Sequence, residues 1–216
     1  MTILHVKTGR AIWLVEARDL NPRGIDIMPI WAAVRDRYKF QTYPKTVEDA
    51  NEDDTKGIVF ELGSFAYESN IHTITRATVF NDGIVVNTGV STRFAEAFLA
   101  DLLDFVSSKF GLTYRPDVVH TRIYTSELIV RTEKDFSRLF APLDSIKEKL
   151  NSLTKHHFEP AGFGFSIDST ASSARPVPFR FEREVGKPFA QNRYYSAAPI
   201  HTSQHEELLR EMEALL

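Results

Sequence analysis

One stretch of the sequence, VVHTRIY at 118–124, places His120, Arg122 and Tyr124 at every second position. Side chains of a β-strand alternate between its two faces, so these three would share one face. An imidazole, a guanidinium and a phenol in a row could hold a phosphate or a carboxylate, or supply a general base beside a positive charge. Arg131 follows on the same stretch. The alternative is the solvated face of a half-buried sheet, with Arg122 paired to an acid across strands.

Two histidine pairs are candidates for metal binding, because imidazole is the commonest metal ligand. The adjacent pair at 156–157 ends a predicted helix and points to two different faces, which is typical of a helix terminus that favours positive charge. His201 and His205 are four residues apart, a spacing that lets two imidazoles share a helix face. However, the N-cap expected at Thr202 or Ser203 leaves His201 outside that helix. The sequence predicts no metal site.

Motifs for nucleotide, zinc or nucleophile chemistry are absent from the sequence. It contains no G-x-x-x-x-G-K-[ST], no H-E-x-x-H and no G-x-S-x-G. GFGFSI at 162–167 has two glycines of a dinucleotide fingerprint, but Ile167 stands where the third belongs. Cysteine is absent, which excludes disulfides and thiolate chemistry. No cofactor is expected.

The segment GKPFAQNRYYSAAP at 186–199 combines aromatic rings, amides and an arginine between two prolines. Such residues are enriched in protein interfaces, because aromatic rings add contact area and arginine adds several donors. The alternative is internal: amides satisfy the backbone of a long connection while tyrosines fix it to the core. The predicted binding residues are Phe189, Asn192, Arg193, Tyr194 and Tyr195.

Composition limits the class of protein. A chain of 216 residues, 43% of them hydrophobic, buries roughly 70% of its unfolded surface, and its 16 phenylalanines indicate a Phe-rich core. A net charge of −3 argues against binding to nucleic acid. No run of eighteen apolar residues occurs, so no membrane span is expected. The first ten residues resemble no targeting segment, which predicts a cytoplasmic protein.

The elements that would position these residues follow from periodicity and turn signals. The acidic stretch 46–57 reads as an exposed loop, and Asp82-Gly83 is the pair that a type I′ hairpin turn prefers. Pro142 should divide the helical pattern of 134–157. The predicted strands are 11–18, 58–67, 73–80, 84–89, 117–133, 162–168 and 179–185, and the predicted helices are 25–38, 92–110, 134–157 and 202–216.

The predicted fold class is α+β, with a mainly antiparallel sheet of six to eight strands packed with three or four helices. We expect a main domain at 1–168, a flexible connector at 169–178 and a C-terminal part at 179–216 that packs on the same domain. The last helix must bury Leu208, Met212 and Leu215 on its own chain or on another subunit, and its narrow apolar stripe favours another subunit.

The function predicted from the sequence is a noncatalytic protein–protein interaction or assembly component, whose partner is another protein or a second copy of itself. The alternative is a small-anion-binding protein, or a hydrolase or transferase, that uses the His/Arg/Tyr sheet face. The sequence leaves open whether the protein is an enzyme.

Overall fold

The computed structural model describes residues 1–46, 57–168, 170 and 176–216, so most of the predicted acidic loop and of the predicted connector lies outside the described residues. Eight strands form one mainly antiparallel sheet in the order β2-β3-β4-β1-β5-β8-β7-β6, which confirms the predicted α+β class. The strands are β1 (Thr2–Leu14), β2 (Ile58–Tyr67), β3 (Asn70–Phe80), β4 (Gly83–Thr88), β5 (Thr121–Arg131), β6 (Gly162–Phe165), β7 (Phe179–Arg183) and β8 (Arg193–Ala198). The helices are α1 (Ala17–Leu20), α2 (Met28–Tyr38), α4 (Thr92–Phe110), α5 (Asp144–Thr154) and α6 (Thr202–Ala214), with short 3-10 segments η1 (Pro116–Val118), η2 (Phe136–Leu143) and η3 (Phe189–Gln191).

The chain divides into two compact units. Unit 1 comprises residues 1–6, 127–199 and 203–216, and unit 2 comprises 7–126 and 200–202. Strands β1 and β5 have residues in both units, so each unit collects segments that are distant in the sequence. The separate division predicted at 168 and 178 is not tested by these units and stays a prediction.

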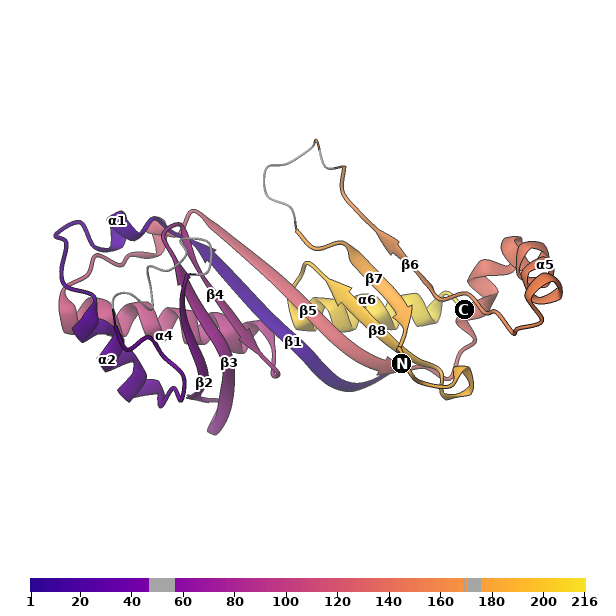
Figure 1. Ribbon diagram of the computed structural model, residues 1–216, viewed down its shortest axis with the longest axis horizontal. Helices are drawn as coiled ribbons and strands as arrows, with labels where there is room; N and C mark the ends of the chain where they lie inside the picture. Colours follow the sequence, from indigo (N-terminus) through magenta and orange to yellow (C-terminus); the bar gives the residue numbers. More distant parts are fainter. Residues whose placement is uncertain (47–56, 169, 171–175) are drawn as a thin grey trace. The chain divides into compact units, whose positions relative to one another are not determined.

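In unit 2, helix α4 lies across strands β2, β3 and β4 (Figure 1). The Ser91 hydroxyl accepts a hydrogen bond from the Phe94 amide, and Gly111 ends the helix in the left-handed region at φ 72°. Its fully buried Phe98 ring lies 4.8 Å from Tyr38 and 5.7 Å from Phe65, both edge-on. Aromatic pairs in this geometry add to the stabilisation from buried area.

The hairpin turns correct one prediction. Phe80 pairs with Gly83 across β3 and β4, so the two-residue turn is Asn81-Asp82, and none of these turn residues nor Gly83 has a positive φ. The type I′ prediction at Asp82-Gly83 is therefore wrong. A positive φ at both central residues occurs instead at Glu68-Ser69, between β2 and β3. A Cβ on Gly83 would come within 2.8 Å of the Trp13 carbonyl oxygen, so close approach of β1, rather than the turn, favours glycine there.

In unit 1, one face of α6 packs on the sheet. Leu209 is fully buried with Phe181 of β7 and Tyr194 of β8, whose rings stack 4.5 Å apart. The helix therefore docks on its own chain, contrary to the preference for another subunit. Leu208, expected to be packed, is 36% exposed on the outer side of the helix, and Leu215, also expected to be packed, is 83% exposed in the turn that follows the helix.

Helix α5 follows η2 in unit 1. Pro142 lies in η2, and regular α-helix begins only at Asp144, which confirms the predicted division of the 134–157 pattern. The helix ends at Lys155 in the left-handed region at φ 57°. None of its residues is buried.

Candidate functional site

Glu96 of α4 is the centre of a polar cluster in unit 2 that includes two of the predicted site residues. The Tyr124 hydroxyl donates to its Oε1 at 2.7 Å, and Arg122 Nη1 lies 3.7 Å from the same oxygen. The Arg122 guanidinium also stacks over the Trp13 ring, 4.6 Å from its centroid. The acid that pairs with Arg122 thus comes from the covering helix, whereas the alternative prediction expected it across strands.

A histidine belongs to this cluster, but it is His201 rather than His120. The His201 ring lies 3.8 Å from the Tyr124 ring, and its Nδ1 is 3.2 Å from the Thr92 hydroxyl. Thr92 and Thr202 exchange hydrogen bonds, each backbone amide donating to the other residue's hydroxyl oxygen at 3.0 and 2.9 Å. These bonds satisfy amides at the first turns of α4 and α6, and they hold His201 against Tyr124.

The chemistry of the Glu96 cluster is that of a closed hydrogen-bonding network. Burial, and then the hydrogen bond to Glu96, raises the pKa of Tyr124 to about 12, so the phenol stays protonated at neutral pH and serves as a donor. The Arg122 charge faces a carboxylate, which opposes the binding of an anion at the same guanidinium. The cluster is suited to holding strand β5 and α4 in register.

The other two residues of the predicted constellation lie elsewhere. His120 precedes β5, its side chain is exposed, and its backbone amide donates to the Leu14 carbonyl at 3.1 Å. Arg131 ends β5 and is exposed in unit 1. The structure therefore brings together Arg122 and Tyr124 only.

The aromatic segment at 186–199 forms η3 and strand β8, an element that the sequence did not indicate. Tyr194 is 3% exposed in the core of unit 1. Arg193 Nε donates to a Glu184 carboxylate oxygen at 2.6 Å, and Asn192 adopts φ 46° while its carbonyl accepts from the Thr132 amide. These contacts are of the internal kind that the alternative described.

Two predicted residues of this segment remain partly accessible. Phe189 is 41% exposed, with the Arg183 guanidinium 4.7 Å from its ring centroid. Tyr195 is half-buried, and burial followed by the charge of Glu127 raises its pKa. A binding role for the segment stays a prediction.

Two further histidines, His205 and His157, lie in different surroundings. His205 is fully buried, and its Nε2 lies 2.8 Å from the Ser196 hydroxyl, which donates to the Arg180 carbonyl. His157 is exposed beside Glu159. Within the described ranges, no group of three or more His, Cys, Asp or Glu side chains could hold a metal ion, and no helix has both the length and the apolar composition to cross a bilayer.

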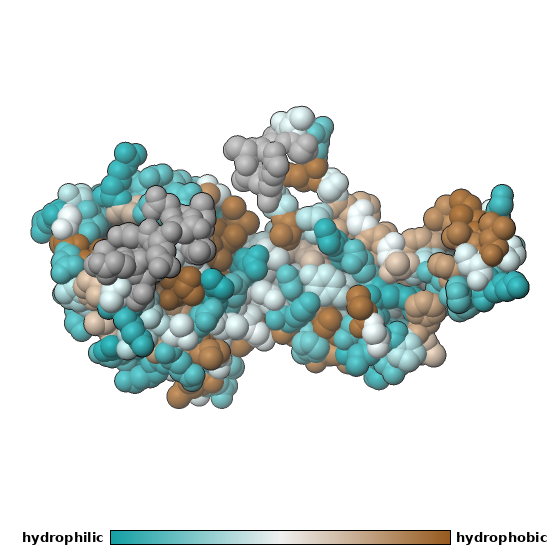
Figure 2. All heavy atoms as spheres, viewed as in Figure 1, coloured by the Kyte–Doolittle hydropathy of each residue, from teal (hydrophilic) through white to brown (hydrophobic). Residues whose placement is uncertain are grey.

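Exposed apolar side chains gather on α5 and at the end of η2. Leu143 of η2 and Ile146, Leu150 and Leu153 of α5, which we call the α5 stripe, are 51%, 57%, 42% and 71% exposed. Their spacing of three, four and three residues aligns them on one side of the helix. Figure 2 shows hydrophobic residues gathered over this helix. Contiguous apolar surface of this kind marks interaction sites in monomeric proteins.

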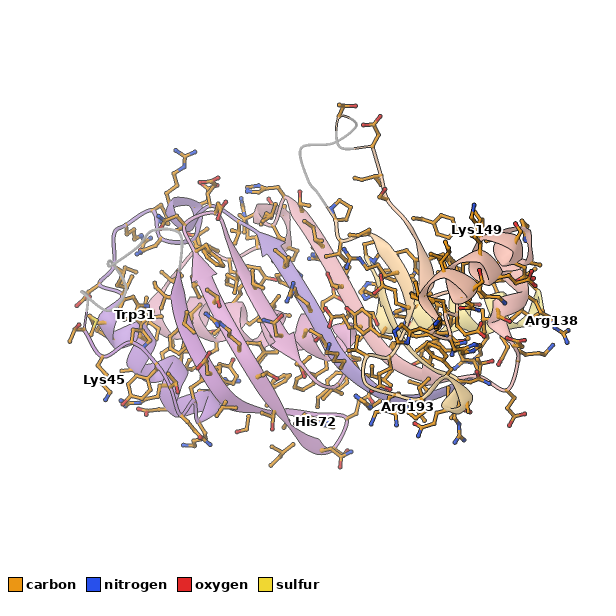
Figure 3. The ribbon with its side chains drawn as sticks, turned by 45° about the vertical axis from the view of Figure 1, so that its right-hand side comes forward. Trp31, Lys45, His72, Arg138, Lys149 and Arg193 are labelled. Atoms are coloured by element: carbon orange, nitrogen blue, oxygen red, sulfur yellow. The ribbon has the colours of Figure 1, made fainter. Side chains whose placement is uncertain are left out.

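Basic side chains border the α5 stripe. At 100° per residue, Lys147 and Lys149 fall on its two sides. Lys147 Nζ lies 2.9 Å from an Asp144 carboxylate oxygen on the same helix, and Lys149 is exposed. Figure 3 labels Lys149 on α5 and Arg138 on the preceding η2. A partner for the stripe would therefore carry acidic groups beside its own apolar residues.

No protein-family model matches this chain, and no curated protein and no solved structure matches it either.

Two features of these sites were missed from the sequence. Glu96 is not among the residues that the sequence analysis singles out, although a carboxylate on a helix that is otherwise buried signals a polar partner. The exposure of the α5 stripe had no sequence signal, because apolar spacing predicts a face that needs cover and does not say what covers it.

Proposed function

We propose that this protein is a noncatalytic assembly component that associates with further copies of itself through helix α5. The observation that carries the proposal is a regular helix with three exposed apolar side chains and no buried residue, preceded by the exposed Leu143 of η2. Isolated helices shorter than about 12–15 residues are marginal in water, and α5 has 11. A partner that covers the α5 stripe would supply the missing stabilisation.

The partner surface in the proposed assembly is the outer side of α6 on another copy. Leu208 of α6 and Leu215 in the turn after it are exposed and seven residues apart, and we call them the α6 stripe. Glu207 and Glu211 are exposed on its solvent side. Acidic groups beside the α6 stripe complement the lysines beside the α5 stripe, and complementary charges set partner and orientation in paired helices.

Charge also argues against a symmetric pairing of two α5 helices. In a two-fold arrangement the same patch meets itself, so Lys147 and Lys149 of one copy would approach the lysines of the other. A contact from α5 to α6 is heterologous, and contacts of this kind form rings or open chains. The proposed product is therefore a head-to-tail oligomer.

The alternative, a small-anion-binding protein or an enzyme on the His/Arg/Tyr face, has less support. Glu96 opposes Arg122, Tyr124 donates to the same carboxylate, and His120 lies outside the cluster. The predicted cytoplasmic location stays a prediction.

Light scattering on the purified chain at increasing concentration tests the proposal. The wild type should exceed the monomer mass of 24.6 kDa, and Leu150→Glu should remain monomeric, because both residue types favour helix while the charge interrupts the stripe. Ser152→Glu, on the outer side of the same helix, is the matched control and should assemble as the wild type does. A wild type that stays monomeric at every concentration, or a Leu150→Glu variant that still assembles, would contradict self-assembly through α5.

Charge reversal tests the choice of α6 as the partner surface. Lys147→Glu with Lys149→Glu should weaken assembly, and Glu207→Lys with Glu211→Lys should weaken it similarly. Combining all four changes in one chain should restore assembly, since the charges are again opposite. If the combined variant is weaker than either double variant, α6 is not the surface that α5 binds.

A further inference from the structure

Unit 2 contains an apolar cavity of about 310 Å³ between helix α2, helix α4 and strands β2 to β4. Its inner wall consists of fully or nearly fully buried side chains, among them Phe60, Phe98 and Leu103. Trp31, labelled on α2 in Figure 3, forms part of the wall. Interiors of proteins are normally packed with few voids larger than a water molecule, so a space of this size exceeds what ordinary packing leaves.

The lining carries no charged side chain, and the side chain of one of its two asparagines is already engaged. The Asn21 side chain donates to the Ile25 carbonyl and accepts from the Ile25 amide, both at 2.8 Å. Asn81 is exposed, and its backbone carbonyl accepts from the Ala17 amide at 2.8 Å. A charged ligand group would meet no counter-charge among these residues, and water would find few partners.

The outer part of the cavity is accessible. Ile27 is 38% exposed, Ala17 of α1 is exposed, and Phe80 is half-buried, although all three line the cavity. The lining thus runs from fully buried residues on α4 to exposed ones on α1 and before α2. A small molecule can enter on this side without separating the buried wall.

We propose that this cavity binds an uncharged apolar molecule of about the size of a bicyclic aromatic ring system, or an apolar chain of similar volume. An engineered apolar cavity of about 150 Å³ stays dry and accepts benzene, and this cavity is about 310 Å³. Phe60, Phe98 and Trp31 supply flat aromatic surface, and affinity comes from apolar contact. The proposal concerns unit 2 and does not depend on the assembly proposed for α5.

The probe for the test is N-phenyl-1-naphthylamine, an uncharged dye that fluoresces in apolar surroundings, added to the full chain. We expect one dye per chain and a raised melting temperature. Ala17→Trp should fill the outer part of the cavity and weaken binding at least tenfold. Arg18→Trp, the adjacent exposed residue that does not line the cavity, should bind as the wild type does.

A second filling variant, Val79→Phe on β3, keeps the test decisive if Ala17→Trp fails to fold. Leu150→Glu separates this cavity from the α5 stripe, because dye bound to the stripe would be lost in that variant. No dye binding to the wild type, binding unchanged by both filling variants, or binding lost in Leu150→Glu would overturn the proposal.

Competition identifies the source of the apolar group. Displacement of the dye by naphthalene supports a compact aromatic ligand, and displacement by 1-decanol supports an uncharged apolar chain. Either result, or both, agrees with the proposed chemistry. If neither compound displaces the dye, the cavity does not select apolar molecules and the proposal fails.

Discussion

Helices α4 and α5 carry apolar residues at the same three- and four-residue spacing, yet these residues are buried in α4 and exposed in α5. Eight residues of α4 are buried, including Phe94, Phe98 and Leu99 at zero exposure, whereas α5 buries none. The α4 surface is covered by strands and by α2 of its own unit. Apolar spacing in a helix therefore predicts that one face should be buried. Whether a segment of the same chain buries that face depends on the rest of the fold.

The N-terminus of α4 has a side-chain cap, whereas that of α5 has none. Ser91 caps α4 and Gly111 terminates it. The residue before α5, Leu143, makes no side-chain capping bond, and the preceding turn contains Pro142. Helix α4 has 19 residues, a cap at both ends and a buried face, whereas α5 has 11 residues, no side-chain N-cap and no buried residue.

We expect the largest effect on stability from a substitution in α4. Phe98→Ala should lower the free energy of unfolding by about 3–5 kcal/mol, because it removes a fully buried ring and leaves a cavity between α4 and the sheet. A urea titration followed by circular dichroism measures this change. A loss below about 1 kcal/mol would mean that α4 is not packed as described.

Two adjacent leucines on α6 allow a buried and an exposed apolar side chain to be compared within one helix. Leu209 is fully buried and Leu208 is 36% exposed. Leu209→Ala should cost about 2–4 kcal/mol, and Leu208→Ala should change the stability of the monomer by less than about 0.5 kcal/mol. Urea titrations at a concentration where the chain is monomeric make the comparison. Equal costs at the two positions would show that the inner and outer sides of α6 are assigned wrongly.

The Glu96 cluster gives the packing of α4 a pH dependence at alkaline pH. The pKa of Tyr124 is raised to about 12 in the folded state, first by burial and then by Glu96. Unfolded tyrosine ionises near about pH 10, so stability that is complete below this pH should fall as the pH rises toward 12. Tyr124→Phe should remove part of that fall. Urea midpoints of both proteins between about pH 9 and 11 test this, and parallel curves would contradict it.

We expect the smallest effect on stability from a substitution in α5. Leu150→Ala in monomeric protein should change the free energy of unfolding by less than about 0.5 kcal/mol, because the side chain is 42% exposed and alanine favours helix. The measurement is again a urea titration. A cost of about 2 kcal/mol or more would mean that α5 packs on its own chain.

Much of the fold follows from sequence signals that act locally. The cap at Ser91, the end of α4 at Gly111 and the interruption at Pro142 appear where the side-chain chemistry requires them. Strand β8 was not indicated, because Tyr194 and Arg193 look like surface residues until Phe181 and Glu184 are brought beside them. Likewise, Arg122 and Tyr124 were found from alternation in β5, while their partner Glu96 and the neighbouring His201 come from distant parts of the chain.

We propose that α5 of one copy binds α6 of another. Mixing two variants, each impaired in one of these surfaces, is the most direct test. Leu150→Glu impairs the α5 stripe, and Leu208→Glu with Leu215→Glu impairs the α6 stripe. Each variant alone should scatter light as a monomer of 24.6 kDa, and an equimolar mixture should give a species of about twice that mass, because one intact α5 meets one intact α6. A mixture that remains monomeric while the wild type assembles would contradict the account.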